Sequence, residues 1–242
     1  MPLALFALTI SAFAIGTTEF VIVGLVPTIA QQLAISLPSA GMLVSIYALG
    51  VAIGAPVLTA LTGRLPRKQL LVALMVLFTA GNLLAWQAPG YMTLIVARLL
   101  TGLAHGVFFS IGSTIATSLV PKEKAASAIA IMFGGLTVAL VTGVPLGTFI
   151  GQHFGWRETF LAVSMLGVIA LISSQLLIPA NIPGRAAASI RDQVKVLTHP
   201  RLLLIYAVTA LGYGGVFTAF TFLAPMMQDL AGFSPAAVSW IL

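Results

Sequence analysis

Long apolar stretches separated by short polar connections dominate the pattern of this chain. Seven of them reach the roughly 20 residues that a helix needs to cross about 30 Å of hydrocarbon. They cover residues 4–28, 40–62, 69–88, 91–119, 127–150, 159–178 and 202–227, and an eighth stretch begins near Ala236. A lipid-facing backbone must satisfy its own hydrogen bonds, and no strand-length alternation is visible, so the pattern predicts helices. The expected fold class is all-α, a polytopic bundle of transmembrane helices.

The composition supports a membrane protein. Of the 242 residues, 60% are hydrophobic and 7% are charged, and the mean hydropathy is +1.12. Soluble globular domains lie far from these values. The opening residues MPLALFALTISAFA resemble a signal peptide, but they lack a basic region and their apolar run continues past Phe20. We therefore interpret them as the first transmembrane helix.

The basic residues gather in alternate connections. Nine of the 11 lie after the second, fourth and sixth spans, namely Arg64, Arg67, Lys68, Lys122, Lys124, Arg185, Arg191, Lys195 and Arg201. By the positive-inside rule, these loops and the N-terminus face the cytoplasm. The net charge of +6 thus indicates topology, and we expect the lipid bilayer rather than a nucleic acid as the partner.

A short internal similarity links the second span to the fifth. Residues 54–56 (Gly-Ala-Pro) match residues 143–145 (Gly-Val-Pro) at an offset of 89. Three spans separate the copies, so they cross the membrane in opposite directions, as in the inverted repeats of secondary transporters. Chance recurrence of Gly-x-Pro in membrane helices is the alternative.

A longer similarity links PTIAQQLAISLPSAG (27–41) to PMMQDLAGFSPAAVS (225–239) at an offset of 197 to 198. A six-span unit therefore starts again near residue 201. We expect a six-helix half (1–180), a cytoplasmic linker (181–200) and the start of a second half that ends early (201–242). Within the linker, SIRDQVKVLTHP has a capping box and one apolar face, which predicts a short helix on the membrane surface.

Three ionisable residues lie inside predicted spans: Glu19, Arg98 and His105. Such residues are costly in a membrane unless they are paired or face water, so each is a candidate functional group. Glu19 lies about 13 Å before the outer end of its span, and Arg98 lies about 10 Å into the fourth. If the two helices are neighbours, we expect the opposite charges to approach directly or through water. A permanent ion pair that only joins the helices is the alternative to a proton-carrying carboxylate.

On the fourth span, Arg98, Gly102, His105 and Phe109 share one helical face. Gly102 permits close approach of another helix. His105 is a candidate for substrate binding or proton relay, and a hydrogen-bonded structural histidine is an equal alternative. The candidates for a substrate cavity are Phe20, Tyr47, His105 and Phe109.

Enzyme and metal constellations are missing from the sequence. There is no cysteine, no HExxH motif and no serine-protease pattern, and the three histidines lie in three separate segments. We therefore expect no catalytic residues, no metal and no cofactor.

Four segments resemble the major facilitator superfamily, specifically its drug and sugar efflux proton antiporters of the arabinose and sugar efflux permease type. They are GTTEFVIVGLVPTIA, GAPVLTALTGRLPRK, ARLLTGLAHGVFF and MFGGLTVALVTGVPLGTFIGQHFGWR. Arg64, Arg67 and Lys68 match the basic positions of the superfamily's loop between spans two and three, although Gly63 replaces its aspartate. Arg98 and Gly102 match the span-four motif. Gly143, Pro145 and Gly147 match the span-five antiporter motif, with the proline one position late.

The resemblance implies a transporter of the bacterial inner membrane that works by alternating access. It would export a small neutral or weakly charged solute, such as a sugar, nucleoside or drug, in exchange for a proton, with the proton gradient as its energy source. Glu19 would carry the proton and Arg98 would tune it. The alternatives are a uniporter or importer of the same fold, or a non-transporting membrane module. Because alternating access needs two halves, the intact transporter is expected to contain a C-terminal half missing here.

Overall fold

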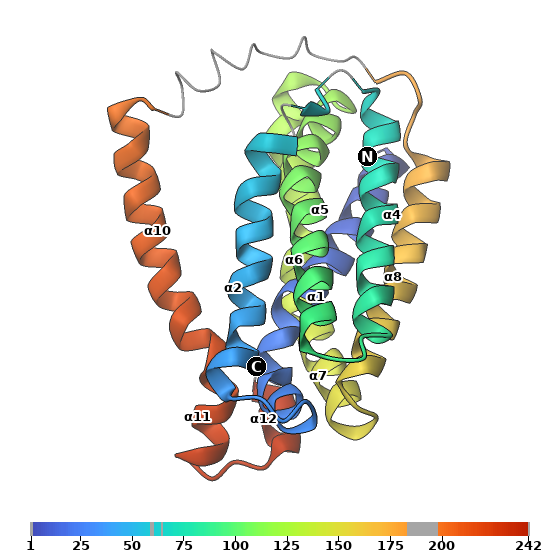
Figure 1. The fold of residues 1–242 in the computed structure, drawn as a ribbon. Helices are drawn as coiled ribbons and strands as arrows, with labels where there is room; N and C mark the ends of the chain where they lie inside the picture. Colours follow the sequence, from blue (N-terminus) through green and yellow to red (C-terminus); the bar gives the residue numbers. More distant parts are fainter. Residues whose placement is uncertain (1, 59–60, 64, 183–197, 242) are drawn as a thin grey trace.

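The computed structural model describes residues 2–58, 61–63, 65–182 and 198–241 (Figure 1). Every regular element in these ranges is helical, which confirms the predicted fold class. Seven of the described helices are long and apolar enough to cross a membrane: Leu3–Gln32, Leu37–Leu58, Arg67–Trp86, Tyr91–Ser118, Lys122–His153, Trp156–Leu177 and Pro200–Asp229.

These spans are built from the following elements: α1 (Leu3–Gln32), α2 (Leu37–Ile53), η1 (Gly54–Leu58), α4 (Arg67–Trp86), α5 (Tyr91–Ser118), η2 (Lys122–Lys124), α6 (Ala125–Val138), η3 (Ala139–Gly143), α7 (Val144–His153), α8 (Trp156–Leu177), α10 (Pro200–Thr221) and α11 (Leu223–Asp229). A further helix, α12, covers Pro235–Ile241.

Helix α1 is the centre of the bundle. It packs against α2, α5, α6, α7 and α8, while α4 pairs with both α5 and α8. Helix α10 stands apart from this six-span body and approaches it at the end where α11 begins (Figure 1). As a result, α1 is largely buried and nearly all of α10 is exposed.

The buried core forms two apolar clusters separated by a polar layer. Along α1, the buried apolar residues between Ala4 and Ile15 belong to the first cluster and those between Val21 and Ala30 to the second. Between them lie the buried Thr17 and Thr18, followed by the partly buried Glu19. The polar layer therefore crosses the middle of the bundle and separates the two apolar parts of its interior.

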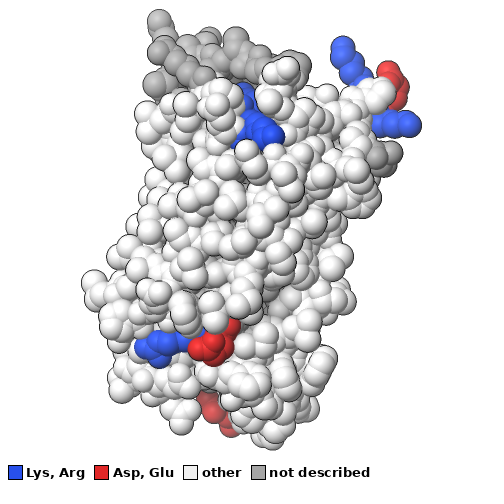
Figure 2. Space-filling view, turned by 90° about the vertical axis from the view of Figure 1, so that its right-hand side faces the viewer, with Lys and Arg blue, Asp and Glu red and all other residues white. Residues whose placement is uncertain are grey.

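The outer surface is apolar over its middle. Figure 2 shows Lys, Arg, Asp and Glu near the two ends of one face, with a broad uncharged band between them. Large hydrophobic side chains on this exterior, among them Leu176 and Val141, are at least 70% exposed. Such a surface matches a lipid solvent, whose hydrocarbon thickness is about 30 Å.

Both spans that carry Gly-x-Pro contain a π-helical turn. The turn η1 begins at Gly54 and includes Pro56, and η3 ends at Gly143, two residues before Pro145. Proline has no N–H and its ring clashes with the carbonyl four residues earlier, so the backbone widens locally. The two matched motifs therefore produce the same local distortion in spans of opposite direction.

The longer similarity also has a structural counterpart. Ala34 and Gly232, which are 198 residues apart, both have positive φ, 53° and 69°. Two residues later, Ser36 accepts a hydrogen bond from Ser39 N, and Ser234 accepts one from Ala237 N. The turn after the first span of the chain is thus repeated after α11.

Part of the predicted linker lies outside the described residues. Helix α8 ends at Leu177 and α10 begins at Pro200. Most of the segment expected to form the membrane-surface helix, 189–200 with Arg191 and Lys195, falls within 183–197. Arg185 and Arg64 are also outside the described part.

Candidate functional site

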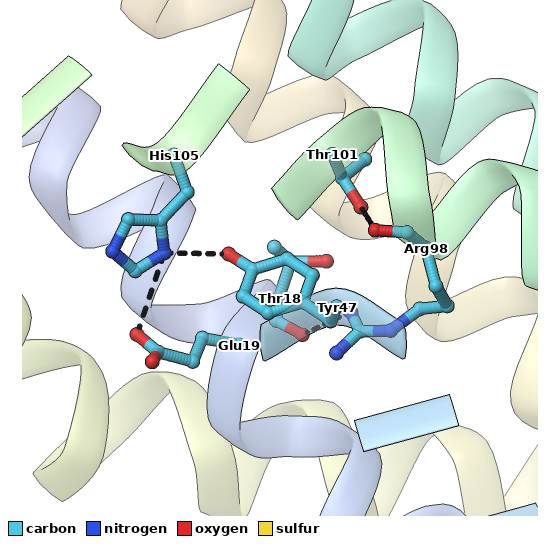
Figure 3. A network of polar contacts seen from close by, with 6 residues as sticks. All are labelled: Thr18, Glu19, Tyr47, Arg98, Thr101 and His105. Carbon is cyan, nitrogen blue, oxygen red and sulfur yellow. Dashed lines mark hydrogen bonds and ion pairs between the residues drawn. The ribbon is translucent and has the colours of Figure 1, made fainter. Parts of the chain in front are cut away.

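Glu19 and His105 form the centre of the polar layer. Glu19 comes from the middle of α1 and His105 from the middle of α5. Their side chains are 17% and 13% exposed, and His105 Nδ1 lies 3.7 Å from Glu19 Oε2 (Figure 3). The contact is an ion pair when the imidazole is protonated. Gain or loss of one proton therefore changes the net charge of the Glu19–His105 pair by one unit.

Tyr47 of α2 is the second partner of the same histidine nitrogen. Its hydroxyl lies 2.8 Å from His105 Nδ1, and the tyrosine is only 2% exposed. An imidazole nitrogen without hydrogen accepts a bond from a hydroxyl, whereas a protonated one donates. The Tyr47 hydroxyl can therefore bond Nδ1 in either protonation state, whereas the Glu19 carboxylate only accepts and favours a protonated Nδ1.

Arg98 lies behind Tyr47, away from the carboxylate. Its Nη1 donates to the Thr18 carbonyl over 2.8 Å and its Nε to the Leu43 carbonyl over 3.3 Å. Its guanidinium carbon lies 4.1 Å from the centre of the Tyr47 ring, a cation–π contact. Arg98 thus ties α5 to both α1 and α2 at this depth.

Glu19 and Arg98 were expected to approach each other directly or through water, and the structure links them through other side chains. Tyr47 lies between the Glu19–His105 pair and Arg98 (Figure 3). The ion pair that the described residues form here joins Glu19 to His105, and Arg98 instead binds the backbone one residue before Glu19. The acid and the guanidinium are linked through Tyr47 and His105 rather than by direct contact.

Glycines bring α2 close enough to α5 to place Tyr47. A Cβ on Gly50 would lie 2.6 Å from the Leu99 carbonyl, and one on Gly102 would collide with the Tyr47 carbonyl. Only glycine allows this approach, which sets the ring of Tyr47 against Arg98 and its hydroxyl against His105. Gly102 of the span-four motif therefore influences the site by letting α2 pack closely against α5.

The span-five glycines pack on the part of α1 that carries Glu19. A Cβ on Gly143 would collide with Thr17, and one on Gly147 would lie 2.6 Å from Val21 Cγ2. Thr17 and Val21 both lie within two residues of Glu19. The motif that contains Pro145 thus fixes the position of the acidic turn from the side of α6, η3 and α7.

A cavity of about 1090 Å³ lies between α1, α2, α5, α6 and α10. Glu19, Phe20, His105 and Phe109 line it, whereas Tyr47 and Arg98 do not. Three of the four residues predicted for a substrate cavity are thus on its wall, and Tyr47 is behind it. The carboxylate and imidazole face the space that a small molecule would enter.

Sequence reasoning missed the contribution of α10. Tyr213 and Phe217 of α10 line the cavity, and Phe133 of α6 lines it as well. Phe217 is the repeat match of Glu19, since 19 + 198 = 217. The repeat was the available signal, because matching positions of two halves face a shared site.

The described residues of the loop motif between spans two and three, Arg67 and Lys68, are not brought to this site. Arg67 and Lys68 occupy the first turn of α4 and do not line the cavity. Within the described ranges, no three His, Cys, Asp or Glu side chains gather as metal ligands would.

Known proteins are similar to this chain in sequence and in fold. Residues 8–242 match the family described as Major Facilitator Superfamily. YtbD, an uncharacterized MFS-type transporter of Bacillus subtilis, is 53% identical over 99% of this chain and 60% of its own length. The inner membrane transport protein YdhP of Escherichia coli is 46% identical over 98% of this chain and 61% of its own length. A chloramphenicol resistance protein of Streptomyces lividans is 37% identical over 99% of this chain and 62% of its own length.

The chain therefore spans about 60% of the length of these curated relatives. Among solved structures, a bacterial homolog of the human lysosomal transporter Spinster, in an inward-facing and unoccupied conformation, has a TM-score of 0.76. The match covers 98% of this chain and 57% of that one, at 19% identity, and supports the fold.

Proposed function

This chain belongs to the major facilitator superfamily, and from that premise we propose that it supplies the proton and substrate site of a secondary active exporter. The observation that carries the proposal is the Glu19–His105 pair on the wall of an apolar cavity. A buried ionisable pair of this kind in a transmembrane bundle is a typical proton site. The substrate would be a small organic solute.

Glu19 is the proposed proton carrier and His105 its partner. Binding of one proton changes the charge of the cavity wall by one unit, so the affinity of the wall for a polar or charged solute changes with it. A ligand shifts a conformational equilibrium only as far as it binds the two states differently. If a proton and the solute compete for Glu19, the solute binds the protonated and the deprotonated protein with different affinities.

Arg98 and Tyr47 are the proposed positioning residues. Arg98 holds the backbone of α1 next to Glu19 through the Thr18 carbonyl, and Tyr47 holds His105. Neither lines the cavity, so both act through their neighbours. A displacement of α2 relative to α1 and α5 would alter the protonation state that these contacts favour.

Direction and topology are proposed from separate observations. The relative named for chloramphenicol resistance favours export over import. The relative named as an inner membrane protein, together with the basic residues at the ends of α4, α5 and α10, supports an inner-membrane location with the N-terminus in the cytoplasm.

The test is solute-dependent proton movement in proteoliposomes. Two preparations are compared: residues 1–242, and the same residues joined to the part of YdhP that follows its matched segment. With a pH-sensitive dye inside, chloramphenicol, L-arabinose and adenosine are added in turn. We expect a saturable proton flux with at least one of them. Solute flux that is indifferent to the pH gradient would indicate a uniporter, and absence of any flux would indicate a non-transporting module.

A further inference from the structure

The imidazole of His105 turns one of its two nitrogens toward its partners and the other away from them. Nδ1 lies 2.8 Å from the Tyr47 hydroxyl and 3.7 Å from Glu19 Oε2, whereas Nε2 points away from both side chains (Figure 3). No residue that the structure describes forms a hydrogen bond with Nε2. The ring lines the cavity and its side chain is 13% exposed. Nε2 is therefore the ring nitrogen that a bound solute can contact.

Tyr47 determines which nitrogen of the neutral imidazole carries the hydrogen. The tyrosine is 2% exposed, and Nδ1 is the partner of its hydroxyl among the described residues. If Nδ1 carried the hydrogen, it would donate to the hydroxyl oxygen and leave the hydroxyl's own hydrogen buried without an acceptor, which is costly. Glu19, at 3.7 Å, is beyond hydrogen-bond distance of Nδ1. The hydroxyl therefore donates to Nδ1, and the hydrogen of the imidazole is on Nε2.

Protonation of His105 does not change the role of Nε2. The neutral ring that accepts from Tyr47 has its hydrogen on Nε2, and an imidazolium has a hydrogen on both nitrogens. Gain or loss of a proton by the Glu19–His105 pair therefore alters the charge of the wall, while Nε2 donates in either state. A solute meets an N–H donor of fixed direction at this point of the cavity.

Other hydrogen-bond donors on the described cavity wall are few and less fixed in direction. Two threonines of the lining, Thr218 and Thr221, already donate to carbonyls of their own helix, α10. Hydroxyls rotate and can donate or accept, and a carboxyl donates only when it is protonated. The remaining described groups of these kinds belong to Glu19, Ser45, Thr209 and Tyr213. The described lining contains no Asn, Gln, Lys or Arg, so the N–H of His105 is the donor whose direction is set by a second side chain.

Aromatic rings surround this donor. On the side of α5 and α6, the ring centroids of His105 and Phe109 are 4.9 Å apart, and so are those of Phe109 and Phe133. On the side of α1 and α10, the ring centroids of Phe20 and Phe217 are 5.8 Å apart. All five side chains line the cavity. A flat aromatic solute therefore finds ring contacts on two walls, and an acceptor atom on its edge would meet the N–H of His105.

We propose that Nε2–H of His105 is the specificity-determining donor of the cavity, that it bonds the carbonyl oxygen of an uncharged aromatic solute, and that Tyr47 keeps the hydrogen on Nε2. The proposal rests on the proposed function and names a substrate class for the same cavity. His105 touches the solute, whereas Tyr47 lies outside the cavity lining and is a positioning residue. The cavity volume of about 1090 Å³ accommodates a compound of three fused rings.

Three uncharged compounds of one shape test the donor. Fluorenone carries a carbonyl oxygen at the position where fluorene has a methylene group and carbazole has an N–H. Residues 1–242 in phosphatidylcholine nanodiscs are titrated with each compound at pH 7. Partition into empty nanodiscs is measured too, so that each affinity is expressed against the concentration in the bilayer. We expect fluorenone to bind roughly fivefold more tightly than fluorene, because it gains one hydrogen bond. Carbazole should bind most weakly, since its N–H faces another N–H.

Two substitutions of His105 separate the donor from the ring. His105→Phe keeps an aromatic ring and removes the N–H, so fluorenone should lose its advantage over fluorene. His105→Gln returns an amide N–H near the position of Nε2 and should restore part of that advantage. His153→Phe, which alters an exposed histidine outside the cavity, is the matched control and should leave the advantage unchanged.

Tyr47→Phe tests the positioning role through a change in selectivity. Without the hydroxyl, Nδ1 can carry the hydrogen and direct it to the Glu19 carboxylate, which leaves Nε2 free to accept. The affinity of carbazole relative to fluorenone should then rise roughly fivefold. A general loosening of the fold would weaken all three compounds alike and leave this ratio unchanged, which would contradict the role of Tyr47.

Infrared spectroscopy of bound fluorenone measures the bond directly and needs no variant. A hydrogen bond to the carbonyl oxygen lowers the stretching frequency of the carbonyl, and isotope labelling of its carbon separates the band from those of the protein. We expect a lower frequency in the parent protein than in empty nanodiscs. In His105→Phe the frequency should return to the value in lipid.

Equal binding of fluorenone and fluorene to the parent would overturn the proposal, as would an unshifted carbonyl frequency. Loss of the advantage in Ser45→Ala or Tyr213→Phe, with His105→Phe unaffected, would assign the donor to a hydroxyl and overturn it as well. Failure of the proposed function is recognised separately. If fluorenone binds as expected but no solute drives proton flux, the donor stands and the exporter is wrong. If proteoliposomes exchange protons for a solute while fluorenone has no advantage over fluorene, the exporter stands and the donor is wrong.

Discussion

The hydroxyl of Tyr47 lies 2.8 Å from Nδ1 of His105, the nitrogen that also lies 3.7 Å from the Glu19 carboxylate. One atom thus has a hydroxyl, which can donate or accept, on one side and a carboxylate on the other. We therefore expect proton occupancy of the pair and the position of α2 to be coupled through that atom. The three side chains come from three helices that meet within one layer of the bundle.

The Tyr47–His105 bond should be measurable as a coupling energy. Tyr47→Phe removes only the hydroxyl and keeps the ring under Arg98. A double-mutant cycle of Tyr47→Phe with His105→Ala, read by denaturant unfolding in detergent, should give a coupling of about 1 kcal/mol. Additive effects of the two substitutions would show that the bond does not stabilise the fold.

Arg98 should stabilise the bundle through geometry as well as charge. Arg98→Ala removes two charge-assisted hydrogen bonds that join three helices, and we expect a loss of about 2 kcal/mol in unfolding free energy. Arg98→Lys keeps the charge but lacks the planar fork that reaches both carbonyls, so it should recover only part of the loss. Arg201→Ala, which alters an exposed residue at the start of α10, is the control. Full recovery by lysine would show that charge alone matters.

Gly102 and Gly134 form a matched pair for the close approach of helices. A methyl group on Gly102 would collide with the Tyr47 carbonyl, whereas nothing lies within 4 Å of the corresponding position on Gly134. Gly102→Ala should therefore destabilise the protein by about 1–3 kcal/mol and weaken solute-dependent proton flux. Gly134→Ala should be neutral or stabilise by up to about 1 kcal/mol through helix propensity. Equal effects in thermal unfolding would contradict the packing role.

In the two repeated turns, Ala34→Gly and Gly232→Ala should change the stability of the protein in opposite directions. Ala34 has a side chain at φ 53°, which costs an L-residue about 1–2 kcal/mol, so Ala34→Gly should raise the unfolding temperature. Gly232 has φ 69°, so Gly232→Ala should lower it. Calorimetry of both variants checks this, and shifts of the same sign would argue against equivalent turns.

The spans were predictable from the sequence, whereas the contacts of the site were not. The fourth span was expected at 91–119 and is Tyr91–Ser118, because hydrophobic length is a local property of the chain. The similar depth of Glu19 and Arg98 in the bundle was also predictable, by counting residues along each helix. Which side chains touch depends on helix rotation, and this places Tyr47 between the acid and the guanidinium. The lining from α10 required the tertiary arrangement, for which the repeat match of Phe217 was the only sequence signal.

Uphill transport by a Glu19→Gln variant is the most direct test of the proton site. The chain joined to the C-terminal part of YdhP is reconstituted with an imposed pH gradient, using the solute that gives saturable flux, and Glu158→Gln serves as control. We predict that the parent and the control move solute against its gradient until a protonophore is added, and that Glu19→Gln only equilibrates the solute. Uphill movement by Glu19→Gln at the parent rate would contradict the assignment of Glu19 as the proton carrier.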